Sequence, residues 1–203
     1  PTITLSNGAT ATYQSGTGSA ALVFRYTVVE GNTDSSDLLV SSYSGTVKDT
    51  AGNTAGAVSG DLGNILVDAN SPSLVSVTAT DGTYKVGDLI TITVIWDEPV
   101  FERITGPSLL LSNGATAGGV ADGSDTIAFG YTIAEGDTDS ADLLVSNTNS
   151  AIVDIVYQLR GGVGANGNVA ENVSGDLGAV IVDANSPTMT ITSTTAGVTD
   201  GST

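Results

Sequence analysis

The hexapeptide VDANSP stands twice in this chain, at residues 67–72 and at residues 182–187. Each copy pairs an aspartate with an asparagine two residues later: Asp68 with Asn70, and Asp183 with Asn185. Ca²⁺ takes six to eight oxygen ligands at roughly 2.3–2.6 Å, and carboxylate and amide oxygens are typical of them. The hexapeptide therefore predicts part of a calcium site, completed by backbone carbonyls, water or nearby loops. The alternative is an ordinary stiff linker, in which Asx-turns precede a proline.

A second acidic sequence is also repeated, as EGNTDSSDL and EGDTDSADL. Its carboxylates are dense enough for a loop-built calcium site: Glu30, Asp34, Asp37, Glu135, Asp137, Asp139 and Asp142. No EF-hand pattern is present. The commoner arrangement is structural, with an Asp or Ser that caps one helical turn, whose Leu38 or Leu143 then plugs the end of the fold.

Three more carboxylates are candidates to complete the first hexapeptide. Asp81 and Asp88 flank an expected hairpin close to residues 68–72, and they are the best placed of the three. Glu98 follows the next expected strand, and the sequence leaves open the end of the fold to which it points.

Composition excludes several classes of function. The 203 residues carry 22 Asp and Glu against 5 Lys and Arg, a net charge of -17, so neither nucleic acid nor an anionic membrane is an expected partner. The absence of Cys and His removes disulfides, common zinc sites and His-based catalysis, and no serine has a plausible base. No stretch approaches the roughly 18 apolar residues of a membrane span. We therefore expect neither an enzyme nor a protein inserted in a membrane.

Internal repetition gives the domain organisation. The EGNTDSSDLLVS segment recurs 105 residues later, whereas VDANSP recurs 115 residues later, so about ten residues are added near 155–164. The repeat predicts a partial unit at 1–70 that lacks its first two strands, and a complete unit at 71–185. The same repeat predicts that residues 186–203 begin a further repeat or act as a donated strand.

The added residues mark the place where the two copies differ. They follow Asp154, the counterpart of Asp49. Both aspartates are expected in turns at strand ends, and a metal-ligand role is the less common alternative. Tyr157 and Arg160 lie within the addition and are candidate partner-binding residues. The alternative is a longer hairpin without a partner, since surface loops tolerate insertion.

The expected elements are short strands throughout. Runs rich in Val, Ile, Thr and aromatic residues with period-2 character occur at 21–29, 89–96 and 125–133. The Asn-Gly of SNGAT predicts tight hairpins, and TDGTY at 80–84 predicts a similar turn. The fold class predicted is all-β, as tandem Ig-like antiparallel β-sandwich repeats.

The order of these pieces carries a family resemblance. The segments SVTATDGTYKVGDLITITVIWDEPV, PSLLLSNGATA, FGYTIAEGDTDSADL and GTVKDTAGN resemble the bacterial Ig-like tandem repeats of large secreted surface adhesins. VDANSP is similar to the acidic linker of cadherins, although serine follows the asparagine where cadherins carry more acidic or amide groups. The resemblance implies export, end-to-end stacking of units and Ca²⁺ near the junctions.

Two classes of function follow from this resemblance. The first is an extracellular cell-surface spacer or filament-building segment, stiffened by Ca²⁺, whose partners are neighbouring repeats or copies of itself. The second is a module that binds carbohydrate or a host surface through loops at the end of the sandwich, although 5% aromatic residues makes a stacking platform scarce.

Overall fold

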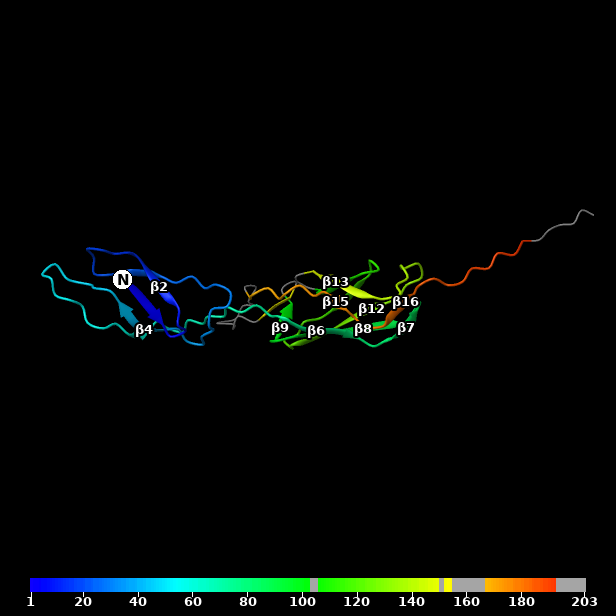
Figure 1. Cartoon of the computed structure of the whole chain (residues 1–203), viewed down its shortest axis with the longest axis horizontal. Helices are drawn as coiled ribbons and strands as arrows, with labels where there is room; N and C mark the ends of the chain where they lie inside the picture. Colours follow the sequence, from blue (N-terminus) through cyan, green and yellow to red (C-terminus); the bar gives the residue numbers. More distant parts are fainter. Residues whose placement is uncertain (103–105, 150–151, 155–166, 193–203) are drawn as a thin grey trace, which may run out of the picture.

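The computed structural model describes residues 1–102, 106–149, 152–154 and 167–192, and these residues form strands and loops without a helix. The chain extends as two β units in a row, with a tail that runs away from the second (Figure 1). Within the described ranges there is no helix long and apolar enough to cross a membrane. The predicted all-β fold is confirmed.

The first unit is one five-stranded antiparallel sheet in the order β3-β2-β1-β4-β5. Its strands are β1 (Thr2–Leu5), β2 (Thr10–Ser15), β3 (Val23–Arg25), β4 (Leu39–Ser44) and β5 (Gly60–Asp61). The Asn-Gly turn joins β1 to β2 as predicted, with Gly8 at a φ of 81° that a side chain would disfavour. The run at 21–29 forms a strand over only three residues, β3, which pairs with β2 alone.

The second unit is larger. Its strands are β6 (Leu74–Ala79), β7 (Gly82–Lys85), β8 (Leu89–Trp96), β9 (Val100–Glu102), β10 (Ser108–Leu111), β11 (Thr116–Gly119), β12 (Thr126–Thr132), β13 (Leu144–Thr148), β14 (Ile152–Asp154), β15 (Gly175–Asp176) and β16 (Val180–Asp183). Seven form a sheet in the order β15-β13-β10-β11-β12-β8-β6, and β14-β9 and β16-β7 form two small sheets. The sheet curls until its edge strands meet, where Ala79 N donates to Leu177 O at 3.4 Å.

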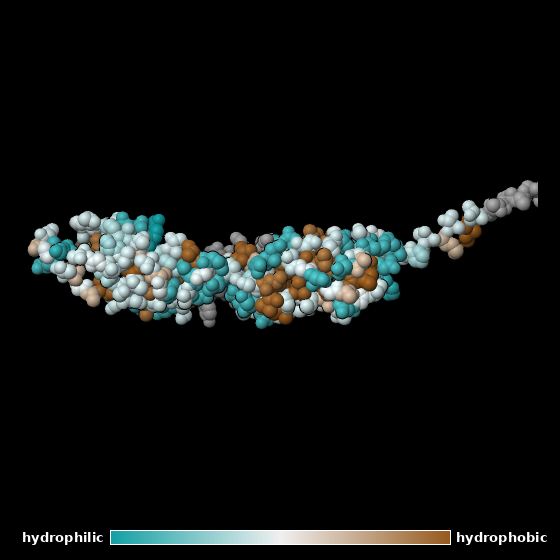
Figure 2. Space-filling view, in the orientation of Figure 1, coloured by the Kyte–Doolittle hydropathy of each residue, from teal (hydrophilic) through white to brown (hydrophobic). Residues whose placement is uncertain are grey.

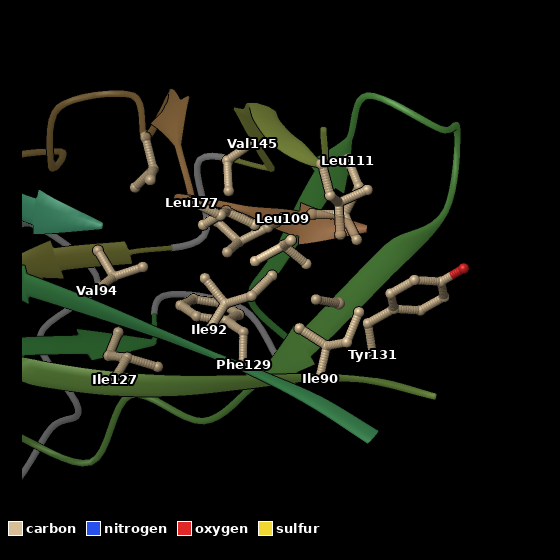
Figure 3. Close-up of a cluster of buried hydrophobic side chains, with 14 of the residues drawn as sticks. Ile90, Ile92, Val94, Leu109, Leu111, Ile127, Phe129, Tyr131, Val145 and Leu177 are labelled. Carbon is tan, nitrogen blue, oxygen red and sulfur yellow. The ribbon is translucent and has the colours of Figure 1, made fainter. Parts of the chain in front are cut away.

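Alternation along two strands builds the core. Every second side chain of β8 and β12 is buried, among them Ile90, Ile92 and Phe129 at 0% exposure. Figure 3 shows these side chains pointing between the layers toward Leu109 and Val145. This two-layer packing gives the second unit its sandwich-like form.

Two local expectations were wrong. TDGTY does not form a hairpin turn, because Gly82–Lys85 is strand β7, and the chain turns only after it, at Gly87 with a φ of 89°. The sheets are not antiparallel throughout either, since β7 pairs in parallel with β16. A parallel pair needs a long connection, which here is nearly the whole unit.

The repeat correspondence holds at the level of topology. The order β3-β2-β1-β4-β5 matches β12-β11-β10-β13-β15, while no described strand beside β3 takes the place of β8 and β6. Phe24, the counterpart of the buried Phe129, is accordingly only half-buried, and Val23 is 51% exposed. Among the described strands, β3 thus pairs on one side alone.

Candidate metal site

The first hexapeptide is held by the acidic loop of its own unit. Asp34 Oδ1 accepts hydrogen bonds from Ala69 N and Asn70 Nδ2, both at 2.9 Å. Glu30 accepts from Ser71 N at 3.0 Å and from Ser71 Oγ at 2.8 Å. The two repeated acidic sequences therefore meet in space. The loop does not cap a helical turn as expected; its carboxylates satisfy the backbone of the hexapeptide instead.

The rest of the acidic loop has structural roles. Leu38 and Leu143 are buried as expected, at 4% and 0% exposure. Asp137 Oδ2 accepts from Tyr131 Oη at 2.8 Å and from Ala134 N at 2.9 Å, and these bonds lower its pKa, the backbone bond most. Asp37 and Asp142 are exposed and do not contact the hexapeptides through any described hydrogen bond.

The second unit meets the hexapeptide through an aspartate and an asparagine. Asn168 donates to Asp154 from its backbone N, 2.7 Å from Oδ1, and from its side chain, with Nδ2 at 2.8 Å from Oδ2. The same Nδ2 lies 3.1 Å from Asp68 Oδ1, 3.4 Å from Asp68 O and 3.2 Å from Asn70 O. Two carboxylate oxygens and two backbone carbonyls thus surround one atom between the units.

The side-chain amide of Asn168 has fewer hydrogens than the four oxygens around it can accept. A side-chain NH₂ carries two hydrogens and cannot satisfy four acceptors. Within the described chain, no group of three or more acidic side chains stands ready for a metal. The oxygens at Asn168 are nevertheless of the kinds that Ca²⁺ takes, and half of them are main-chain carbonyls rather than carboxylates.

Charge accumulates at this junction, and none of the Lys and Arg residues that the structure describes forms an ion pair with it. Burial raises the pKa of Asp68, and the charges of Asp154 and Asp34 raise it further. Burial likewise raises the pKa of Glu98 to about 7, with contributions from Asp154 and then Asp68. Asp154, only 2% exposed, also has a raised pKa because of burial, although its bonds from Asn168 oppose the rise.

Among the described residues, every charged group responsible for these shifts is another carboxylate. The one ion pair found among the described residues, Lys85 with Asp88 at 3.1 Å, belongs to the far end of the second unit. On the visible face, hydrophilic residues gather where the units meet (Figure 2). A cation would relieve this repulsion.

The first unit contains the same aspartate–asparagine pair in solvent. Asn53 donates to Asp49 Oδ1 from its backbone N and to Oδ2 from Nδ2, both at 2.8 Å. Here the hydrogen bonds from Asn53 dominate and lower the pKa of Asp49, whereas burial raises the pKa of Asp154. Asp49 also accepts backbone bonds from Ala51 and Gly52, which lower its pKa further. The bonds from the asparagine are the same in both copies, and burial at the junction is what raises the pKa of Asp154.

Two of the carboxylates predicted to complete the calcium site at the first hexapeptide lie elsewhere in the structure. Asp81 Oδ1 accepts from Ala179 N at 2.9 Å, and Asp88 bonds to Lys85, whose strand position pairs with Asp183. Asp88 therefore lies near the second hexapeptide, and Asp81 lies beside Ala179, three residues before it, because β6 carries the chain away from the first hexapeptide. Glu98 lies at the junction, which answers the question left open by the sequence.

The second hexapeptide repeats the bonding of the first within its own unit. Asp139 Oδ1 accepts from Ala184 N and from Asn185 Nδ2, both at 2.8 Å. Asp183 is exposed, whereas its counterpart Asp68 is half-buried. The two hexapeptides thus share one local structure and differ in what covers them.

The loops offered for other partners are described only in part. Tyr157 and Arg160 lie outside the described residues. A pocket on the second unit is lined by Gly106, Pro107, Ser108, Gly118, Gly119, Val120, Asp122, Thr126 and Ala128. It has no aromatic side chain on which a sugar could stack.

Asn168 is the site residue that sequence reasoning missed. Its signal was present: the 115-residue shift of the hexapeptide maps Asn53 of VKDTAGN onto Asn168, beyond the added residues. No protein-family model matches the chain, and no curated protein sequence matches it.

Proposed function

We propose that this chain is a structural spacer of an extracellular adhesive protein, in which Ca²⁺ stiffens the junction between successive β units. The observation that carries the proposal is the convergence of four oxygens, from Asp68, Asn70 and Asp154, on one point between the units. The family resemblance of the sequence supports the adhesive and extracellular setting.

The donor set suits a hard cation. Asp68, Asp154 and the carbonyl of Asn70 would hold the ion where the amide nitrogen of Asn168 now lies. Glu98 and the amide oxygen of Asn168 are the further ligands we assign. Bound Ca²⁺ would supply positive charge beside these carboxylates, and mixed carboxylate and carbonyl ligands favour Ca²⁺ over Mg²⁺.

A cation at this position would act on stiffness because its ligands come from both units. Asp68 and Asn70 belong to the first unit, and Asp154 belongs to the second. Without the ion, repulsion between these carboxylates favours separation of the units; with it, they are cross-linked. A spacer gains reach only when such joints resist bending.

Thermal melting of the full chain in Ca²⁺ and in EDTA tests the site. With a Kd of about 0.1–1 mM, as extracellular modules often show, 10 mM Ca²⁺ adds about 1.4–2.7 kcal/mol to the free energy of unfolding. That gain raises Tm by roughly 3–10 °C for a chain of this size. The fluorescence of Trp96, the only tryptophan and two residues from Glu98, gives a second readout.

The repeat offers a matched control. Asp154→Asn should abolish most of the Ca²⁺-dependent gain in Tm, whereas Asp49→Asn, which alters the same local bonds away from the junction, should preserve it. Equal melting of the unmodified chain in Ca²⁺ and EDTA would contradict the site. Equal losses in the two variants would show that the effect is not specific to the junction.

Stiffness is measured directly by distances between the units. Because the chain has no cysteine, Thr12→Cys and Ser146→Cys place spin labels on exposed strand positions of each unit. We expect a narrower distance distribution in Ca²⁺ than in EDTA. Ca²⁺ binding with an unchanged distribution would support a site but not a stiffening role.

A further inference from the structure

The chain that joins the two units, residues 68–74, carries a main-chain hydrogen bond at every residue, and we call it the linker. Linkers between domains are ordinarily exposed, and few contacts cross them. Here Pro72 is buried, and Ala69 is only 3% exposed. The linker is therefore part of the folded structure of both units.

The first unit bonds to alternate residues of the linker. Its acidic loop accepts the N–H groups of Ala69 and Ser71, at 2.9 and 3.0 Å, and Gly31 N donates to Ala69 O at 2.9 Å. Among the described bonds, none from the first unit reaches the carbonyl of Asp68 or Asn70. In an extended chain the polar groups of successive residues point to opposite sides, so these two carbonyls face away from the first unit.

The second unit bonds to the residues in between. Asn168 Nδ2 donates to the carbonyls of Asp68 and Asn70, at 3.4 and 3.2 Å, and Glu171 N donates to Pro72 O at 2.9 Å. Three carbonyls at alternate positions thus meet one short segment, residues 168–171. The linker lies between the two units as an extended strand that they share.

The segment 168–171 is itself held by the second unit. Asp154 N donates to Asn168 O, and Ala170 N donates to Ile152 O, both at 3.1 Å. These bonds lie along β14, which pairs with β9 at the junction end of the unit (Figure 1). The position of the segment is therefore set by strands of the second unit and not by the linker.

A second contact fixes the chain directly after the proline. Ser73 N donates to Asp97 Oδ1 at 2.7 Å, and Asp97 N donates to Ser73 O at 3.1 Å. Leu74 N lies 3.3 Å from Glu171 Oε2. Pro72, whose ring fixes φ, connects this contact to the bonds that precede it. A rotation of one unit about the linker would break bonds on one side or the other.

We propose that residues 168–171 and Asp97 form a docking surface for the linker of the preceding unit, and that this contact fixes the orientation of the two units before any cation binds. The surface bonds chiefly to main-chain atoms, so the partner that it fits is an extended segment. Asn168 is the positioning residue, because its one amide bonds to both units. The contact goes beyond the proposed function and does not require a cation.

The repeat supplies a control for this surface. The shift of 115 residues maps Asn168 onto Asn53 and Glu171 onto Gly56. Asn53 donates to Asp49 as Asn168 donates to its own aspartate, but the described bonds of Asn53 do not reach the linker. Asn53→Ala therefore removes the same local bonds and leaves the junction intact.

Distances between spin labels at Thr12→Cys and Ser146→Cys, measured in EDTA, test the docking surface. We expect one peak with the same mean as in Ca²⁺, although it is broader. Asn168→Ala and Asp97→Ala should each broaden this peak further in EDTA, because each removes bonds between the linker and the second unit. Asn53→Ala should leave the peak unchanged.

Amide hydrogen exchange in EDTA gives a second measurement and checks folding. Asn168→Ala should lower the protection of the Glu171 amide by roughly 2- to 10-fold, as expected for the loss of one hydrogen bond that holds the linker in place. The amide of Phe129, in the core, should exchange at an unchanged rate. If Phe129 also loses protection, the variant is unfolded, and Asp97→Ala decides the question.

The outcomes separate this contact from the cation site. A broad distribution in EDTA that becomes one peak only in Ca²⁺ would overturn the docking surface and leave the proposed function standing. A single peak in EDTA that neither Asn168→Ala nor Asp97→Ala broadens would overturn the docking surface as well. A single peak in EDTA that both variants broaden, without a Ca²⁺-dependent rise in Tm, would support the docking surface and contradict the proposed function.

Discussion

Glu98→Gln should have opposite effects with and without Ca²⁺. Glu98 stands at the junction with a pKa raised from its ordinary 4.5 to about 7, first by burial and then by the charges of Asp154 and Asp68. Because the folded state disfavours its charged form, the stabilising contribution is complete below about pH 4.5 and is lost as the pH rises through about 7. Glutamine removes the charge and keeps the shape of the side chain.

The size of the effect follows from the pKa difference. From 4.5 to about 7 the shift corresponds to at most about 3.4 kcal/mol at 1.36 kcal/mol for each tenfold step. Glu98 is partly open to solvent, and screening reduces this to about 1–2 kcal/mol. In EDTA at pH 8, Glu98→Gln should therefore raise Tm by roughly 2–8 °C.

Thermal melting from pH 5 to pH 8, in EDTA and in Ca²⁺, measures both effects. In Ca²⁺ the variant should lose part of the gain in Tm, since it lacks a charged ligand. Glu135→Gln is a control of opposite sign: hydrogen bonds from Ser186 lower the pKa of Glu135, so its contribution is lost as the pH falls. A variant no more stable than the unmodified chain in EDTA at pH 8 would refute the reasoning.

Two pairs of neighbouring residues test the core by urea unfolding. Gly119→Ala should cost about 1–3 kcal/mol, because a Cβ there would lie 2.6 Å from the ring of Phe129, whereas Gly118→Ala, with no atom within 4 Å, should change stability by less than about 0.5 kcal/mol. Leu109→Ala, at 0% exposure, should cost about 2–5 kcal/mol, and Leu110→Ala, at 43% exposure, less than about 1 kcal/mol. Equal effects within either pair would contradict the assigned burial.

Much of the fold was predictable because side-chain alternation is a local property of a strand. The run at 89–96 matches β8 residue for residue, and the Asn-Gly turns lie between strands as expected. The prediction of a turn at TDGTY was wrong. Its composition is typical of a turn, but the segment pairs with a distant strand, β16, and forms strand β7. Pairing between segments nearly 100 residues apart leaves no local signal.

The candidate site was only partly predictable for a similar reason. Repetition pointed to Asp68 and Asn70, and it held the signal for Asn168 as well. The repeat could not show at which end of the unit Asp81 and Glu98 lie. That depends on the direction of each strand between them and the hexapeptide. Asp81, the nearer of these two carboxylates in sequence, bonds to Ala179 away from the first hexapeptide, whereas Glu98, two strands later, lies at the junction.

The sequence by itself determined the alternation that makes strands, the repeat that makes two units and the local bonds of each acidic motif. These bonds are the same in both copies, since they join residues of one unit. The tertiary structure decided which copy of the aspartate–asparagine pair is buried. Asp49 and Asp154 each accept hydrogen bonds from the asparagine at the equivalent position, yet the pKa of Asp49 is lowered and the pKa of Asp154 is raised. Only Asp154 lies against a neighbouring unit, which excludes water and brings other carboxylates close.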